Sequence, residues 1–154
     1  MITEGERQAI RDHVNHVEDP EVPITLTNLG VVREIQFGDD EVVVTLRPTR
    51  LACPAREEMA RRVRLAVAEA APVKDVEIRW EMAAWRGTDV SAAGTKVLLD
   101  IGYAHPHLTR LLCPFCGADD VRAEGDYGGS VCKKPYTCRA CGSGFDKLKS
   151  SSPG

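Results

Sequence analysis

Apolar positions in the first part of the chain follow a helical period. Thr3 and Glu6 form a Thr-x-x-Glu capping box, which is typical of the start of a helix. The apolar stripe that follows at helical spacing consists of Ile10, Val14 and Val17. Two prolines within residues 18–23 end this helix and predict an extended loop.

The next apolar positions alternate with polar ones, as expected for strands. Residues 31–37 predict one strand, residues 38–40 a turn rich in Gly and Asp, and residues 42–46 a second strand. A two-residue period on both sides of a short turn indicates an antiparallel hairpin.

A second helical stripe follows the hairpin. It predicts a helix from about Pro54 to Ala71, with Pro54 at the first helical position and Cys53 at the N-cap. Its buried face is expected to consist of Met59, Val63, Ala66, Val67 and Ala70. Residues 76–80 predict a third strand, and residues 96–101 a short further strand.

The order helix, hairpin, helix, strand predicts an α+β fold over residues 1–104. A second, smaller domain is expected over residues 105–150, and residues 151–154 are expected to be a disordered tail. The second domain holds few residues able to form a core. It therefore needs an additional source of stability.

Paired cysteines supply that source. Two Cys-x-x-Cys-Gly sequences, at 113–117 and 138–142, each direct two sulfurs to one side of a tight turn. The four ligands of the predicted structural zinc ribbon are Cys113, Cys116, Cys138 and Cys141. Four thiolates complete a tetrahedral Zn²⁺ shell and leave no position for substrate. A redox dithiol pair and a rubredoxin-like iron site are the alternatives.

Charge and compartment limit the other function classes. The net charge is −3, and residues 113–154 hold six basic and five acidic residues, so no nucleic acid is expected as a partner. No apolar run approaches the length that spans a bilayer, and no secretory pattern begins the chain, so we expect no membrane association and a cytoplasmic location. Cysteines in that compartment are kept reduced, which favours metal ligation over disulfides.

Two cysteines lie outside the predicted ribbon site. Cys53, beside Arg50 and Arg56, is either a small buried apolar residue or a thiolate that binds a soft metal, with Thr49 able to hydrogen-bond its sulfur. Cys132 is either a buried strand residue or a free thiolate favoured by the two lysines that follow it.

The four histidines are weaker candidates for metal ligands than the cysteines. His13 and His16 are three residues apart on the first helix and are expected to be exposed polar residues. His105 and His107 flank Pro106 in the linker, where they are either solvent-exposed or close to the metal.

Several motifs together resemble a known family. Residues 19–23 (Asp-Pro-Glu-Val-Pro), 28–32 (Asn-Leu-Gly-Val-Val) and 44–54 resemble the SufT-like iron–sulfur assembly domain. The middle and tail resemble the branch of that family with a C-terminal zinc ribbon, the PaaD-type subunit of the phenylacetate-CoA oxygenase (epoxidase) system. The motifs of this part are Trp85-x-x-Thr88-Asp89, Gly102-Tyr103-Ala104, the two cysteine pairs and Phe145-Asp146. Asn28 replaces the usual aspartate, which removes a carboxylate from this position.

The resemblance implies a fold of helices packed on a short mixed sheet, and an accessory protein, not an enzyme. The implied task in phenylacetate catabolism is delivery of iron or an iron–sulfur cluster to a multicomponent di-iron monooxygenase. Cys53 would be the transfer ligand, with Thr49 supporting and Cys132 as a second candidate. The implied partners are the oxygenase and reductase subunits and iron–sulfur assembly proteins, and a homodimer could share the cargo.

Two other functions fit the same residues. The ribbon could be a protein-binding adaptor without cargo metal, with a contact face of Lys133, Lys134, Arg139, Lys147 and Lys149. A thiol enzyme using Cys53 is a weaker alternative, because the sequence places no base beside it.

Overall fold

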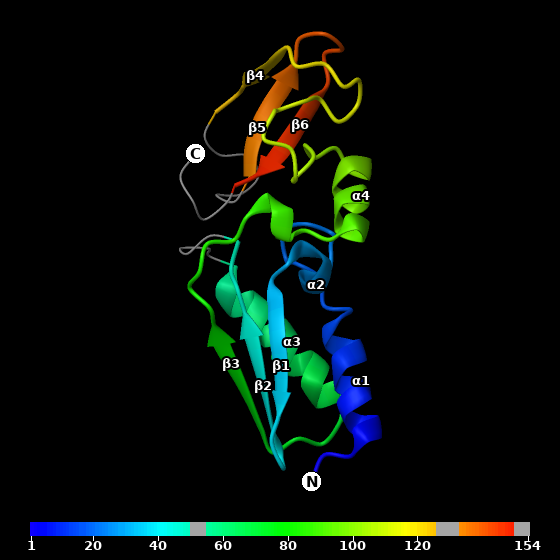
Figure 1. The fold of residues 1–154 in the computed structure, drawn as a ribbon, viewed down its shortest axis with the longest axis vertical. Coiled ribbons are helices and arrows are strands. Elements are labelled where there is room, and N and C mark those ends of the chain that lie inside the picture. The colour runs from blue at the N-terminus through cyan, green and yellow to red at the C-terminus, as the bar shows by residue number, and fades with distance from the viewer. Residues whose placement is uncertain (50–54, 126–132, 150–154) are drawn as a thin grey trace. The chain divides into compact units, whose positions relative to one another are not determined.

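The computed structural model describes residues 1–49, 55–125 and 133–149. They form two compact units (Figure 1). The first contains residues 1–48 and 55–83, and the second contains Thr49 and the described residues from 84 onward. The predicted domain limits at residues 104 and 150 stay a prediction, and the expected tail at 151–154 lies outside the described residues.

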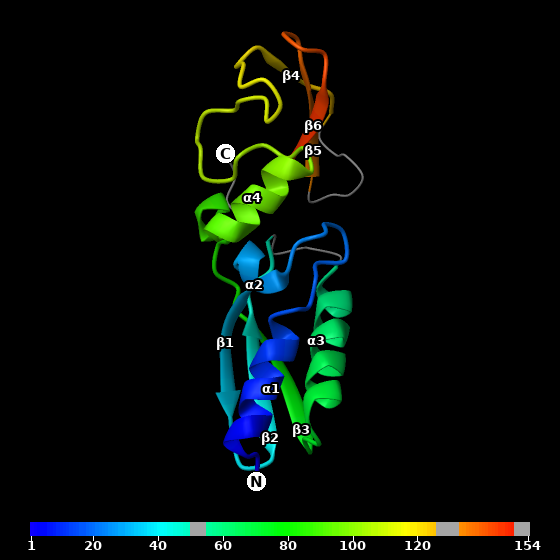
Figure 2. The ribbon, with the colours of Figure 1, turned by 90° about the vertical axis from the view of Figure 1, so that its right-hand side faces the viewer.

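The first unit is a three-stranded sheet with two longer helices on one side (Figure 2). Its elements are α1 (Glu4–Val14), α2 (Leu26–Leu29), β1 (Val32–Phe37), β2 (Glu41–Leu46), α3 (Arg56–Ala70) and β3 (Asp75–Trp80). The strand order is β1-β2-β3, with β1 antiparallel and β3 parallel to β2. The expected mixed sheet is therefore present.

The core of this unit lies between the sheet and helices α1 and α3. Successive side chains of a strand point to opposite faces, so the central strand β2 buries every second residue. The completely buried side chains include Ile10, Val14, Val42, Val44, Leu46, Val63 and Val67. Each aliphatic side chain of this kind contributes about 1.5–3 kcal/mol when buried. The capping box at Thr3 is as the sequence predicts. The predicted apolar stripes are confirmed except that Val17, although buried, lies beyond the end of α1, and Ala70 of α3 is only partly buried.

Strands β2 and β3 and helix α3 form a parallel crossover unit. The carboxyl end of β2 leads through residues 47–55 into α3. Helix α3 begins at Arg56 with Ala55 as its N-cap, and no side chain caps it. The prediction that Pro54 begins the helix and Cys53 caps it is therefore wrong by two residues. Proline is tolerated before a helix as well as in its first turn, so sequence alone did not fix the start.

Helix α2 was not expected from the sequence. Thr25 caps it by accepting a hydrogen bond from the Asn28 backbone N–H at 3.2 Å. Gly30 ends it in the left-handed conformation at φ 84°. The glycine of the Asn-Leu-Gly motif thus has a local structural role, because a β-carbon disfavours this conformation.

The second unit contains the cysteine-rich region. Its elements are η1 (Gly87–Asp89), α4 (Ala92–Asp100), β4 (Val121–Ala123), β5 (Lys133–Cys138) and β6 (Gly144–Leu148). The three strands form an antiparallel sheet in the order β4-β5-β6. The strand predicted at residues 96–101 is wrong, because residues 96–100 are the second half of α4 and Ile101 is its C-cap. The Ser91 hydroxyl accepts from the Gly94 backbone N–H at 3.0 Å and begins this helix.

Residues after α4 pair directly with the ribbon. The Ala104 N–H donates to the Asp146 carbonyl at 2.8 Å, and the Asp146 N–H donates to the Gly102 carbonyl at 3.2 Å. Tyr103 forms a parallel bridge with Asp146. These bonds explain why α4 belongs to the same compact unit as the cysteines. Among the described residues, no helix is both long and apolar enough to cross a membrane.

Candidate metal centre

The four predicted zinc ligands come together in the second unit. The pair Cys113 and Cys116 precedes β4, Cys138 ends β5, and Cys141 lies in the turn before β6. Their Sγ atoms all lie within 4.8 Å of one another. Among the described residues, these four cysteines are the one cluster of three or more His, Cys, Asp or Glu side chains close enough together to hold a metal ion. The arrangement joins two turns that are distant in the sequence.

The two cysteine turns have nearly the same backbone geometry. The Gly117 N–H donates to the Cys113 carbonyl at 2.9 Å, and the Gly142 N–H donates to the Cys138 carbonyl at 2.8 Å. Both glycines have a φ of 79°. A residue with a β-carbon is strained in this region, so the glycine of each Cys-x-x-Cys-Gly sequence allows the turn to close.

The sulfur spacing matches a tetrahedral metal shell. Sγ of Cys113 lies 3.8 Å from Sγ of Cys141, and Sγ of Cys116 lies 3.6 Å from Sγ of Cys138. A tetrahedron with Zn–S bonds of about 2.3 Å has edges of about 3.8 Å. These two distances match the edge of a Zn²⁺–thiolate tetrahedron, and all four sulfurs lie within 4.8 Å of one another. Four thiolates around one ion leave no open coordination position.

Neighbouring groups already favour thiolates at part of this cluster. Hydrogen bonds from the Ser143 side chain and backbone lower the pKa of Cys141 to about 6. At Cys116 the Ala118 backbone hydrogen bond acts in the same direction, but the nearby sulfurs, above all that of Cys138, and burial raise its pKa to about 12. Thiols this close cannot all ionise unless a cation balances them. The donor set thus suits a divalent metal.

The protein core beneath the cluster is small. Its buried members are Ala104, Cys113, Cys138 and Phe145. Tyr136 stacks on Phe145 with ring centroids 5.6 Å apart. Two of the four core residues are cysteines of the cluster, so the core of the ribbon includes half of the metal ligands. A core of this size needs metal ligation for its stability.

The other predicted ligand residues are Cys53, Cys132 and the supporting Thr49. Cys53 and Cys132 lie outside the described residues, so their roles stay predictions. Thr49 is described, and it is buried, with 4% of its surface exposed. It belongs to the second compact unit, although it follows strand β2 of the first.

The histidines have partners other than the cysteine sulfurs. His13 and His16 each hydrogen-bond through Nδ1 to a carbonyl one helical turn back, at 2.9 and 2.6 Å. His107 Nε2 donates to the Val90 carbonyl at 2.6 Å, and the His107 backbone N–H donates to Nδ1 of His105 at 3.1 Å. His105 and His107 are not among the ligands of the metal group, which contains cysteines alone, and their proximity to the metal stays a prediction.

Sequence reasoning missed the residues that support the cysteines. Ser143 donates hydrogen bonds to Cys141, and the Phe115 N–H lies 3.4 Å from Sγ of Cys113. Phe115 itself is 56% exposed. A serine two residues after the last cysteine is the sequence signal for the first of these contacts. The second is a backbone contact that any residue except proline could make at position 115.

Two protein families match the two parts of the chain. Residues 7–80 match the family described as iron-sulfur cluster assembly protein. Residues 104–149 match the PaaD zinc beta ribbon domain. The second match begins at the residue that pairs with Asp146 and includes all four clustered cysteines.

Curated relatives agree with these matches. The chain is 27% identical to a putative 1,2-phenylacetyl-CoA epoxidase subunit of Escherichia coli (strain K12), over 88% of each chain. It is 29% identical to the Fe-S protein maturation auxiliary factor YitW of Bacillus subtilis (strain 168), over 49% of this chain and 74% of that one. One is named as a subunit and the other as an auxiliary factor, in agreement with the expectation of an accessory protein and not an enzyme.

A solved structure bears on the fold alone. A crystal structure of a domain of unknown function, DUF59, from Bacillus anthracis superposes with a TM-score of 0.56 at 23% identity. The match covers 64% of this chain and 94% of that chain. It confirms the α+β fold expected for the first part of the sequence.

Proposed function

Because residues 7–80 match an iron–sulfur cluster assembly family and residues 104–149 match the PaaD zinc β-ribbon domain, we propose that the chain is an accessory protein in iron–sulfur protein maturation. The similarity to the putative epoxidase subunit of Escherichia coli, over 88% of both chains, is the observation that carries this proposal. An alignment of this extent includes both matched regions of the chain in a single relative. The similarity to a maturation auxiliary factor supports the same role for the first domain.

The metal at the four cysteines is zinc, and its role is structural. The Sγ–Sγ distances of 3.8 Å for Cys113 and Cys141 and 3.6 Å for Cys116 and Cys138 suit Zn²⁺, and the match to a zinc ribbon family supports the same metal. With all four positions taken by thiolates, this ion neither activates water nor binds substrate. It supplies folding free energy to the ribbon. Any exchangeable cargo must therefore bind elsewhere.

Cys53 is the proposed ligand for that cargo. It follows β2 and precedes α3, within the connection of the parallel crossover. In proteins with parallel strands, small ligands commonly bind just beyond the carboxyl ends of the strands. The segment between β2 and α3 follows such an end. Thr49, buried in the same connection, would support the sulfur, and Cys132 is a second candidate ligand. A single protein thiolate binds iron or a cluster weakly, which suits a carrier that must release it.

The targets are the components of a multicomponent di-iron monooxygenase of the phenylacetyl-CoA epoxidase type. The oxygenase component needs iron, and its reductase needs an iron–sulfur cluster, so both could receive the cargo. Iron–sulfur assembly proteins would supply it, and a homodimer could share it between two copies of Cys53. This pathway and these partners rest on the likeness to the Escherichia coli protein. The proposed location is the cytoplasm.

The test compares metal content in wild type, Cys53→Ala and Cys132→Ala. Each protein is purified without oxygen, and zinc, iron and acid-labile sulfide are measured per chain. We expect about one zinc in all three, from the single four-cysteine site, and iron in the wild type but not in Cys53→Ala. Iron in the co-produced oxygenase component should fall with the same variant. Normal iron in that component with Cys53→Ala would contradict the cargo role. Cys132→Ala shows whether the second thiol contributes.

An adaptor without cargo metal is the second candidate function. Lys134 of β5 and Lys147 of β6 are direct cross-strand partners, and like charges at such positions are destabilising. In the described part of the chain, no ion pair joins either lysine to a carboxylate. An acidic protein surface would relieve this repulsion. If wild type and Cys53→Ala hold equal zinc and neither holds iron, the adaptor explains the chain better than the carrier.

A further inference from the structure

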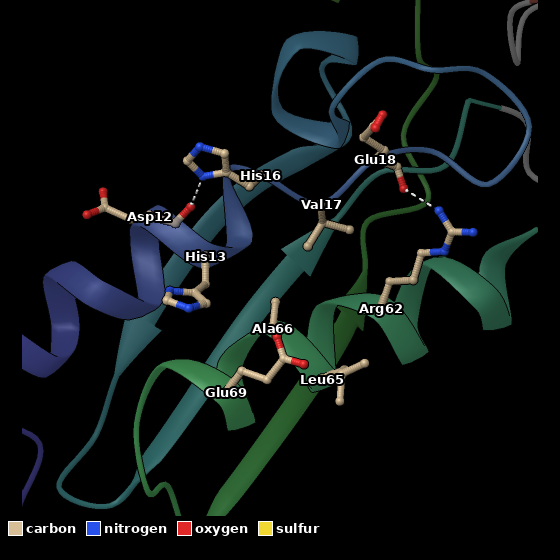
Figure 3. Close-up of a pocket in the computed structure, with 9 residues that line it drawn as sticks. All are labelled: Asp12, His13, His16, Val17, Glu18, Arg62, Leu65, Ala66 and Glu69. Atoms are coloured by element: carbon tan, nitrogen blue, oxygen red, sulfur yellow. Dashed lines mark hydrogen bonds between the residues drawn. The ribbon is translucent and has the colours of Figure 1, made fainter.

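A groove opens between the end of α1 and helix α3 in the first unit (Figure 3). Its volume is about 450 Å³. Residues from α1 and the segment after it form one wall, and residues from α3 form the other. The lining residues are Asp12, His13, His16, Val17, Glu18, Arg62, Leu65, Ala66 and Glu69. The groove thus belongs to a different compact unit from the cysteines of the metal centre.

The floor of the groove is apolar. Val17 and Ala66 are both buried, and Figure 3 shows them on facing sides of the groove. Leu65, on α3, is 49% exposed. Covering this leucine would release its hydration water and contribute favourable free energy. An occupant with an aliphatic portion is therefore favoured.

Arg62, the cation of the lining, is already held within the protein through two of its donors. Nε of Arg62 donates to the Glu58 carboxylate at 3.0 Å, and its Nη1 donates to the Glu18 carbonyl at 3.1 Å. Nδ1 of His13 and of His16 must carry the hydrogen, because the partner of each is a carbonyl oxygen. In the neutral ring, Nε2 of both histidines is therefore an acceptor.

The carboxylates of the lining are largely available. Among the described residues, the side chains of Glu18 and Glu69 make no hydrogen bond or ion pair, and Asp12 accepts only from Gln8 Nε2, at 2.9 Å. Figure 3 shows Glu69 across the groove from His13. Apart from the remaining N–H groups of Arg62, the open polar side-chain groups of the lining are acceptors, and three of them are carboxylates. This excess of acceptors repels anions and suits a cation that donates several hydrogen bonds.

We propose that this groove docks a basic segment of a partner protein, with an arginine or lysine beside an apolar residue. The cationic head would donate to Glu69 and to the free imidazole nitrogens. The aliphatic stem and the apolar neighbour would cover Val17, Ala66 and Leu65. A bound metal ion fits less well, because the described lining contains no three ligand atoms close enough together to share one ion. This docking role is independent of any cargo at Cys53.

The test uses the full zinc-loaded chain and two synthetic peptides. One alternates arginine with leucine, and its match has glutamate in place of every arginine. Nuclear magnetic resonance titration follows the methyl groups of Val17 and Leu65 and the rings of His13 and His16. We expect saturable shifts at these groups with the arginine peptide, and weaker binding as salt increases. The glutamate peptide should produce no saturable shift.

Variants identify the groove as the binding surface. Glu69→Gln removes one exposed carboxylate and should weaken binding of the arginine peptide about three- to tenfold, the range of one ordinary net hydrogen bond. Glu57→Gln, which removes an exposed carboxylate from the start of α3, should leave the affinity unchanged. The same spectra show that both variants remain folded. Equal effects of the two variants, shifts confined to other surfaces, or comparable binding of the glutamate peptide would overturn the proposal.

Discussion

Sγ of Cys113 and Sγ of Cys141 lie 3.8 Å apart, although the two cysteines are 28 positions apart in the chain. A contact of this kind closes a long loop without a disulfide, and only a shared cation makes four adjacent thiolates favourable. Both Cys113 and Cys138 are also core residues of the ribbon. Loss of the metal should therefore remove the ribbon core together with the metal site.

Chelation of zinc should unfold the ribbon and leave the first unit folded. Structural zinc sites of four thiolates contribute about 10 kcal/mol or more to folding. Amide resonances of β4, β5 and β6 should collapse into the unfolded region, while those of β1, β2 and β3 keep their dispersion. Cys113→Ser should have the same effect without a chelator. A ribbon that keeps its dispersion after complete zinc removal would show that its apolar contacts suffice.

Gly87 should not tolerate a side chain, because the backbone of another segment lies too close to it. A β-carbon at this position would lie 2.0 Å from the carbonyl oxygen of Pro106, and that oxygen belongs to rigid backbone. Gly87→Ala should destabilise the second unit by about 1–3 kcal/mol, the usual cost of overpacking. Thermal unfolding of the zinc-loaded protein measures it. Gly125→Ala is the matched control, because no atom lies within 4 Å of its added β-carbon. Similar melting temperatures for the two variants would refute the close approach.

Features with local sequence signals could be predicted well. The capping box at Thr3, the hairpin strands and the two cysteine turns each depend on residues within a few positions of one another. Their physical causes are hydrogen bonds to adjacent backbone, alternation of burial along a strand, and the backbone freedom of glycine. The clustering of the four cysteines was predictable because zinc chemistry restricts how two such turns can combine.

Features that depend on tertiary contacts could not be predicted. The apolar run within residues 96–101 is too short to distinguish a strand from a buried helix. In the structure, Ser91 caps a helix in this region, and Leu98 lies on the buried face of that helix. The pairing of Ala104 with Asp146, which joins α4 to the ribbon unit, links residues far apart in the chain. The supporting bond from Ser143 to Cys141 likewise depends on the folded turn.

The capping box of α1 should make stability depend on pH in the acid range. The Thr3 backbone N–H donates to the Glu6 carboxylate at 3.0 Å, and bonds from the Thr3 backbone and side chain hold the pKa of Glu6 below its ordinary value. A carboxyl with a lower pKa in the folded state stabilises the protein above its unfolded pKa. This contribution is lost as the pH falls through the folded pKa.

Two variants distinguish the stabilising effect of the Thr3 cap from that of the Glu6 charge. Thr3→Ala should destabilise the first unit by about 1 kcal/mol at neutral pH, because an N-cap hydrogen bond is lost. Glu6→Gln should keep the capping geometry, since glutamine also serves at this position, but should flatten the loss of stability below about pH 4.5. Urea unfolding at several pH values measures both. A Glu6→Gln protein with the acid dependence of the wild type would show that other carboxyls dominate it.

The lysine pair across β5 and β6 leads to the last prediction. Lys134 and Lys147 are direct cross-strand partners, and Nζ of Lys134 lies 5.6 Å from the centroid of the Tyr136 ring. Lys147→Glu should replace repulsion by attraction and stabilise the ribbon by about 0.5–1 kcal/mol. Denaturant unfolding of the zinc-loaded protein measures this gain.

A double-mutant cycle tests whether the gain comes from this pair. Lys134→Glu alone should also stabilise the ribbon, whereas the double variant places two glutamates opposite each other and should lose the gain. Lys96→Glu, at an exposed position of α4, makes the same change in net charge and should have little effect. If all of these variants shift stability equally, net charge and not the cross-strand contact is responsible. If the cycle holds, the wild-type protein retains an avoidable repulsion at this position, as expected for a surface that meets an acidic partner.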